Sequence, residues 1–239
     1  MELSKREKIN NNYKRVVEQV NQAALYAQRD PGDIRLVVVT KTHPFEVIQC
    51  VAEAGATDFG ENYVEEAIPK IKSLGIGLNW HMIGHVQSRK AQNVCEYFQY
   101  VHSVDSVKLA QRLSRFSESL NKTLPIWLEF NVSGEASKFG WNIKTQIDLE
   151  NIVPDIQKIA SLPNLKLVGL MTVPPYSKNP EDSRIYYQRL FKFQKYIGNS
   201  LQLPDFKGLS MGMSSDFEIA IQEGSTCVRI GQAILGPRS

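Results

Sequence analysis

Residues 34–40, Ile-Arg-Leu-Val-Val-Val-Thr, form the stretch of sequence from which the fold can be inferred. The run is rich in β-branched residues, and its apolar side chains hardly alternate with polar ones. A strand of a parallel sheet has this character, because helices cover the sheet on both faces. The stretch therefore predicts a buried strand of an α/β protein.

Strand-like and helix-like segments alternate along the rest of the chain. The other strand-like segments are residues 57–60, 79–84, 100–103, 124–132, 165–171, 208–211 and 226–230. Helical patterns cover residues 44–54, 62–73, 88–97, 106–119, 145–160, 182–199 and 216–223. This alternation predicts a single (β/α)8 barrel of the TIM type over residues 1–239, with an extra helix within the first 30 residues. An open doubly wound sheet is the alternative, since short strands are easily miscounted.

Charge and cysteine content limit the partners and the compartment. The formal net charge is +3, and the basic residues are scattered, so we expect no nucleic-acid or membrane partner. No apolar run approaches the roughly 20 residues that cross a bilayer. Cys50, Cys95 and Cys227 lie far apart, as buried thiols in a reducing cytosol do. The sequence therefore predicts a cytoplasmic protein.

The segment after residue 208 carries the clearest sign of a ligand. Ser214 and Ser215 follow a strand, and Ser215 with Glu218 fits a capping box that starts a helix directly after Ser215. The next strand ends at Gly231, where a ligand can approach the backbone closely. These loops follow strands seven and eight, where barrels often bind phosphate. An ordinary helix cap and a tight turn are the alternative reading of each loop.

Three other polar residues are expected at or near the same rim. Lys41 follows the strand of residues 34–40, so it is either a lysine with its stem on apolar surface or a Schiff-base lysine. Arg229 lies in the barrel interior or behind the helices, and it needs either a ligand or an ion-pair partner there. Asn62 is either a helix cap or a ligand contact.

His81 and His85 stand four residues apart, a spacing that could hold a metal ion on a helix. This segment has the pattern of a strand entering a loop, and no cysteine or carboxylate cluster joins the two histidines. We therefore predict no metal site.

Short motifs along nearly the whole chain resemble those of one protein family. In chain order they are Val39-Thr40-Lys41, Phe-Gly-Glu-Asn-Tyr-Val at 59–64, Trp-His-Met-Ile-Gly-His at 80–85, Gly-Leu-Met-Thr at 169–172, Leu-Ser-Met-Gly-Met-Ser at 209–214 and Val-Arg-Ile-Gly at 228–231. Together they resemble the pyridoxal phosphate homeostasis proteins, which share the barrel of the alanine racemase N-terminal domain. The resemblance implies pyridoxal 5′-phosphate as the cofactor, held as a Schiff base on Lys41. It also implies cofactor contacts from Asn62, Met211, Ser214, Ser215, Arg229 and Gly231.

The same resemblance implies a role in vitamin B6 and amino-acid homeostasis, with no catalytic residue. We expect a pyridoxal phosphate carrier, a monomer that serves client enzymes, because the chain has no second domain to supply an opposing acid–base group. A weak amino-acid racemase, with Tyr63 or His85 as the second base, is the alternative. A barrel that binds other proteins without a cofactor is a third.

Overall fold

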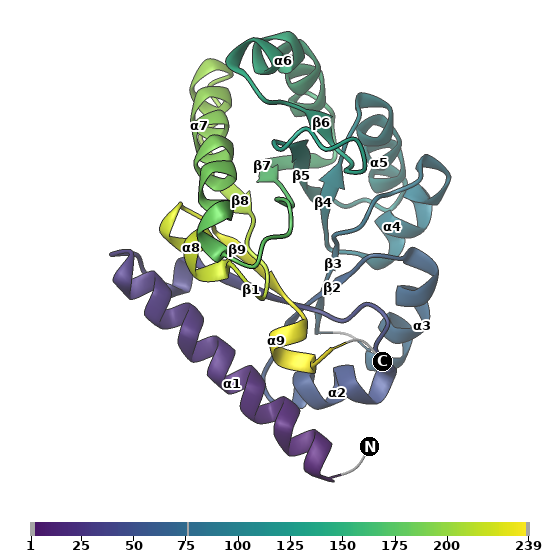
Figure 1. Ribbon diagram of the computed structural model, residues 1–239. Coiled ribbons are helices and arrows are strands. Elements are labelled where there is room, and N and C mark those ends of the chain that lie inside the picture. The colour runs from purple at the N-terminus through teal and green to yellow at the C-terminus, as the bar shows by residue number, and fades with distance from the viewer. Residues whose placement is uncertain (1–2, 76, 238–239) are drawn as a thin grey trace.

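Eight parallel strands close into a barrel in the computed structural model, which describes residues 3–75 and 77–237 (Figure 1). The strands pair in the order β4-β3-β2-β1-β9-β8-β7-β5, and β5 pairs with β4 to complete the ring. Their bounds are β1 Arg35–Val39, β2 Asp58–Glu61, β3 Asn79–Met82, β4 Tyr100–Val104, β5 Leu124–Asn131, β7 Leu165–Met171, β8 Gly208–Ser210 and β9 Cys227–Ile230. The predicted (β/α)8 barrel is confirmed, and the open sheet is wrong because β4 pairs with β5.

Helices surround this barrel, as the alternating pattern predicts (Figure 1). They are α2 Phe45–Glu53, α3 Val64–Leu74, α4 Ala91–Tyr97, α5 Val107–Ser119, α6 Gln146–Ala160, α7 Arg184–Ser200, α8 Phe217–Gln222 and α9 Gln232–Leu235. Short 3-10 turns, η1 Pro31–Asp33, η2 Ser88–Lys90 and η3 Pro180–Ser183, precede β1, α4 and α7. A strand of two residues that the sequence pattern did not predict, β6 Trp141–Asn142, pairs with β5.

The extra N-terminal helix is α1, Leu3–Tyr26, and residues 1–2 of the predicted helix lie outside the described residues. It contacts α2, α8 and α9 (Figure 1). Ile9, Val16 and Val20 are buried at helical spacing, and Asn12 donates a hydrogen bond to the Ile234 carbonyl at 3.1 Å. The helix therefore packs its apolar face against the outer helices of the barrel and contacts α9 near the C-terminal end of the chain.

Cys50, Cys95 and Cys227 are all buried and free of disulfides, as predicted. None of the helices in the described part of the chain is long and apolar enough to cross a membrane.

Strands β7 and β8 approach each other closely at a pair of glycines. Gly169 on β7 is paired with Gly208 on β8, and a Cβ on Gly169 would overlap the Gly208 carbonyl group. The Gly208 carbonyl carbon and oxygen belong to the main chain of the barrel wall. A change of side-chain rotamer therefore cannot make room for a Cβ on residue 169. The barrel therefore needs glycine at position 169.

We expect Gly169→Ala to lower the free energy of unfolding by about 1–3 kcal/mol, because it forces β7 away from β8. Urea denaturation followed by circular dichroism measures the change. The matched control is Gly198→Ala within α7, where a Cβ would meet no atom closer than 3.7 Å. That control should gain about 0.5–1 kcal/mol from helix propensity. Equal stability of the two variants would contradict the argument.

Candidate functional site

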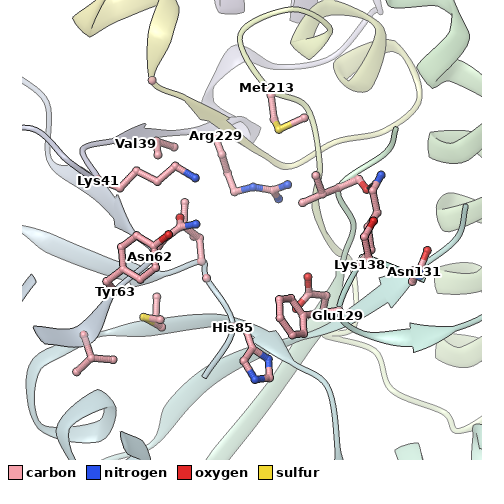
Figure 2. A pocket seen from close by; sticks show the side chains of 18 of the residues that line it. Val39, Lys41, Asn62, Tyr63, His85, Glu129, Asn131, Lys138, Met213 and Arg229 are labelled. Atoms are coloured by element: carbon pink, nitrogen blue, oxygen red, sulfur yellow. Dashed lines mark hydrogen bonds between the residues drawn. The ribbon is translucent and has the colours of Figure 1, made fainter. Parts of the chain in front are cut away.

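A cavity of about 1190 Å³ opens at the end of the barrel where the strands terminate. In Figure 2, Lys41 and Asn62 project into it from one wall, Glu129 and Lys138 lie on the opposite side, and Arg229 extends between them. The lining residues come from the carboxyl ends of most of the strands and from the loops that follow them, as expected for a parallel barrel. They include Lys41, Asn62, Tyr63, His85, Glu129, Asn131, Lys138, Met213, Ser214, Ser215, Arg229 and Gly231.

The peptide that carries Lys41 is held on both sides by hydrogen bonds. Before it, the buried Thr40 donates its main-chain N–H to the Gly60 carbonyl at 3.0 Å. After it, Thr42 adopts a positive φ of 65° and donates its N–H to the Glu66 carboxylate at 2.5 Å. Lys41 therefore starts from a fixed main chain at the end of β1.

Lys70 on α3 links both of these anchors. Its ammonium donates to the Thr40 carbonyl at 3.1 Å, to Glu61 at 2.9 Å and to Glu66 at 2.6 Å. Glu61 is fully buried, and burial raises the pKa of its carboxyl although Lys70 and Thr40 act in the opposite direction. Because Lys70 and Glu61 are both buried, each charge depends on the opposite charge of its partner for stabilisation.

We expect Lys70→Met to lower the free energy of unfolding by about 3–5 kcal/mol, because it leaves the Glu61 carboxylate buried without a cation. Chemical denaturation measures this loss. Lys158→Met is the matched control, since Lys158 pairs with Asp155 at 3.0 Å but has a side chain that is 66% exposed. An exposed pair contributes less than about 1 kcal/mol. A small loss in Lys70→Met, comparable to the control, would show that the buried cluster does not anchor this loop.

The loop after β8 has a different cap from the predicted one. Helix α8 begins at Phe217 with Asp216 at its N-cap, and it has no side-chain capping bond. The predicted capping box of Ser215 and Glu218 is therefore wrong. The Asp216 carboxylate instead accepts from the Met213 N–H at 2.7 Å and from the Ser183 hydroxyl at 2.9 Å, which shapes the loop from within.

Ser214 and Ser215 line the cavity on this loop, as does Gly231 after β9. The Ser214 hydroxyl oxygen accepts from the Ala233 N–H at 3.2 Å, so the loops after β8 and β9 are joined. The phosphate site that the sequence predicts on these two loops stays a prediction.

Arg229 and Asn62 also reach the cavity. Arg229 is 4% exposed and lies inside the barrel, where its guanidinium donates to the Thr172 carbonyl at 2.8 Å and to the Ser210 hydroxyl. Burial lowers the pKa of Arg229 from its high ordinary value, although interactions with nearby acidic groups act in the opposite direction. Asn62 is not the helix cap, because Tyr63 holds the N-cap position of α3. The buried amide oxygen of Asn62 has no hydrogen-bond partner among the described residues.

Met211 does not lie with the other predicted site residues. It is fully buried in the hydrophobic core, and Met213 lines the cavity in its place. The strand ends at Ser210, so the two methionines belong to an irregular loop in which strand alternation no longer predicts direction.

Glu129 is one of the lining residues that the sequence analysis missed, with Asn131, Lys138 and Met213. It lies on β5 and lines the cavity, and one of its carboxylate oxygens is buried with no hydrogen-bond partner among the described residues. Burial, with a smaller contribution from Asp105, raises the pKa of Glu129 to about 7, although Arg229 opposes the shift. A single acidic residue inside the apolar run of residues 124–132 was the signal available in the sequence.

His81 and His85 point to different surroundings, so they do not form a pair. His81 bonds to Asp58 and His102 inside the barrel, whereas His85 contacts Asp105 at 3.0 Å and stacks on Phe139 at the cavity. Within residues 3–75 and 77–237, no group of three or more histidine, cysteine or acidic residues is arranged to hold a metal ion.

Comparison with known proteins identifies relatives that match nearly the whole chain. Residues 6–239 match the family model of the alanine racemase N-terminal domain. The pyridoxal phosphate homeostasis protein of Pseudomonas aeruginosa is 40% identical over 228 residues, which cover 95% of this chain and 94% of the relative. That of Escherichia coli is 37% identical over 235 residues, which cover 96% and 97%.

Solved structures give the same picture. The crystal structure of an unknown protein from Bifidobacterium adolescentis superposes with a TM-score of 0.86 at 31% identity, covering 98% of this chain and 97% of the other. PipY of Synechococcus elongatus, with pyridoxal phosphate bound, superposes with a TM-score of 0.77 at 32% identity, covering 90% and 98%. Alanine racemase of Corynebacterium glutamicum, at 17% identity and a TM-score of 0.69, covers 96% of this chain and 60% of its own, and shares the fold.

Proposed function

The chain belongs to the alanine racemase N-terminal domain family and, within it, to the pyridoxal phosphate homeostasis proteins, and from this premise we propose that it binds pyridoxal 5′-phosphate in the cavity that Lys41 lines. The observation that carries the proposal is the convergence of Lys41, Arg229 and the Ser214–Ser215 loop on that one cavity. PipY, which covers 90% of this chain, has the same cofactor bound.

The residues present fit the chemical groups of this cofactor. Lys41 supplies a primary amine, which is the group that condenses with an aldehyde to form a Schiff base. Ser214 and Ser215 supply hydroxyl donors for a phosphate, next to Gln232, which follows Gly231 and also lines the cavity. The buried amide oxygen of Asn62 lacks a partner in the described residues, and a bound ligand could provide one. Met211 would contribute only by packing behind the loop.

Each of these residues has a defined task in the proposal. When bound, pyridoxal phosphate would supply a reactive aldehyde and an aromatic ring that can accept electrons. Lys41 holds the cofactor from a loop that Lys70 and Glu66 anchor. Arg229 presents a buried positive charge, which disfavours protonation of any basic atom that faces it. Such a charge would weaken the ring as an electron acceptor.

The protein is proposed to hold and supply the cofactor without turning over a substrate. The relatives are named for pyridoxal phosphate homeostasis. At the rim of the cavity, Tyr63, Phe139 and Tyr176 are exposed to solvent. Catalysis of carbanion chemistry gains from the exclusion of water, and this open rim does not provide it. Vitamin B6 homeostasis is therefore the function that the site supports best.

The proposal extends to the organisation and setting of the protein. Residues 1–239 form one cofactor-binding domain that works as a monomer in the cytoplasm and supplies client enzymes. The buried free thiols of Cys50, Cys95 and Cys227 support a reducing compartment.

Reconstitution with pyridoxal phosphate tests the central step. We expect the wild-type protein to acquire the visible absorption band of a Schiff base, and Lys41→Ala to lack it, because the alanine cannot condense with the aldehyde. Lys90→Ala is the matched control, since Lys90 also lines the cavity. Borohydride reduction followed by peptide mass mapping should put the cofactor mass on Lys41. A wild-type protein that never acquires the band, or a Lys41→Ala variant that keeps it, contradicts the proposal.

A weak racemase is the second candidate, and Glu129 is the observation that favours it. A general acid–base group works best when its pKa lies near the operating pH, and the pKa of Glu129 is about 7. Glu129 lines the same cavity as Lys41, Tyr63 and His85. These side chains could move a proton at a substrate carbon, and so catalysis needs a direct test.

Exchange of the α-proton separates the two candidates. In D2O with single L-amino acids, we expect the loaded protein to exchange the proton no faster than free pyridoxal phosphate does, because the rim is open to water. Nuclear magnetic resonance follows the loss of the α-proton signal. A rate of α-proton exchange well above the rate with free pyridoxal phosphate would establish the racemase instead, provided that Glu129→Gln, Tyr63→Phe or His85→Gln abolishes the excess.

A further inference from the structure

A chain of polar side chains runs through the inside of the barrel, and we call it the axial chain. It consists of Asp58, His81, His102, Ser210 and Arg229. Asp58 Oδ1 lies 2.9 Å from His81 Nε2, and His81 Nδ1 lies 2.9 Å from His102 Nε2. His102 Nδ1 lies 2.7 Å from Ser210 Oγ, which also accepts a hydrogen bond from Arg229 Nη1.

The axial chain connects the two ends of the barrel. Asp58 lines a second cavity of about 690 Å³, which α1 and the beginnings of the strands surround. Arg229 lines the cavity that contains Lys41. Between them, His81, His102 and Ser210 are completely buried. Without water to substitute, each polar atom of the chain depends on its protein neighbour for a hydrogen bond.

Asp58 sets the first proton position in the chain. Burial alone would raise its pKa, but hydrogen bonds from His81 and Thr57 and the charge of Arg35 hold the pKa of Asp58 below its ordinary value. The carboxylate is therefore ionised at neutral pH and can only accept hydrogen bonds. It follows that His81 carries its proton on Nε2.

The remaining proton positions follow from the neutrality of both rings. Burial lowers the pKa of His81 and holds the pKa of His102 well below its ordinary range. A neutral imidazole donates from one nitrogen and accepts at the other. His81 Nδ1 therefore accepts from His102 Nε2–H, and His102 Nδ1 accepts from the Ser210 hydroxyl. The single hydroxyl proton of Ser210 is thereby directed to His102.

We propose that Asp58 is a positioning residue for the Lys41 cavity, which it controls by fixing the hydrogen-bond direction of the whole axial chain. With its proton committed to His102, Ser210 presents only acceptor lone pairs to Arg229. In the reverse direction His102 would donate to Ser210, so the serine proton would have to turn to the Cys227 sulfur, a weak acceptor, or would oppose the Arg229 N–H groups. A buried polar group left without a hydrogen-bond partner destabilises the arrangement that contains it. The charge of Asp58 thus selects the arrangement in which Arg229 is held in place.

If the axial chain were only a structural polar core, it would pack equally well with either histidine tautomer. The proposal instead requires one tautomer at His81 and at His102, and this requirement can be tested. Two-dimensional NMR of protein labelled with ¹⁵N-histidine reports which ring nitrogen carries the proton. In the wild-type protein without added cofactor, we expect Nε2–H at both His81 and His102. A proton on Nδ1 of either ring, or a charged ring at neutral pH, overturns the proposal, and this measurement needs no variant.

Asp58→Asn tests whether the carboxylate is the cause. An asparagine offers His81 either an oxygen or an NH2 group, so both directions of the chain become accessible. We expect the ¹⁵N shifts of His102 to move toward the average of the two tautomers, although His102 does not touch residue 58. Asp33→Asn is the matched control, because Asp33 lines the same second cavity outside the axial chain. Unchanged His102 shifts in Asp58→Asn overturn the proposal.

The consequence for the cofactor rests on the proposed function and is measured separately. We expect Asp58→Asn and Ser210→Ala each to weaken pyridoxal phosphate binding about tenfold, equivalent to ~1.4 kcal/mol, and to shift the absorption maximum of the bound cofactor. Asp33→Asn should bind as the wild type does. If both variants bind with wild-type affinity and spectrum, the positioning role is overturned. If the wild type itself binds none, the proposed function fails, while the tautomer measurement still decides the direction of the axial chain.

Discussion

The pairing of β4 with β5 is the constraint on which the architecture of this protein depends. Val101 opposite Ile126 and Val104 opposite Leu128 close a sheet that would otherwise have two free edges. Because all strands of the ring are parallel, closure brings their carboxyl ends to one rim, and the loops that follow β1, β8 and β9 meet there. The cavity is thus a consequence of the barrel rather than a separate feature added to it.

The interior of this barrel carries an unusual polar content. Arg229 is almost fully buried, and it is tolerated because Thr172 and Ser210 accept its hydrogen bonds. Lys70 and Glu61 form a second buried polar cluster under the Lys41 loop. Arg229 lines the cavity, and Lys70 bonds to the Thr40 carbonyl directly before Lys41, which also lines it. Each group has little freedom to move, because its departure would leave a buried partner unsatisfied. The polar interior therefore holds the cavity in a preformed shape.

Much of the fold and part of the site could be predicted from local pattern. One cavity is lined by Lys41, Asn62, Ser214, Ser215, Arg229 and Gly231, and each lies within a predicted strand or no more than four residues after one. Predictions failed where local rules compete with tertiary contacts. Ser215 does not cap α8, because Asp216 is engaged by Met213 and Ser183. Met211 is in the core, since the main chain beyond Ser210 no longer follows strand alternation.

By itself, the sequence determined the order of strands and helices, the amphipathic helix α1 and the rim position of Lys41. Those features depend on periodicity and on neighbours within a few residues, which the sequence displays directly. Only the tertiary structure decided that Glu129 and Arg229 line the same cavity, and that His102 bonds to Ser210 across 108 residues. Such contacts arise when barrel closure juxtaposes distant strands. No local pattern predicts them, because each residue has the sequence character of an ordinary strand residue and only the fold brings the partners together.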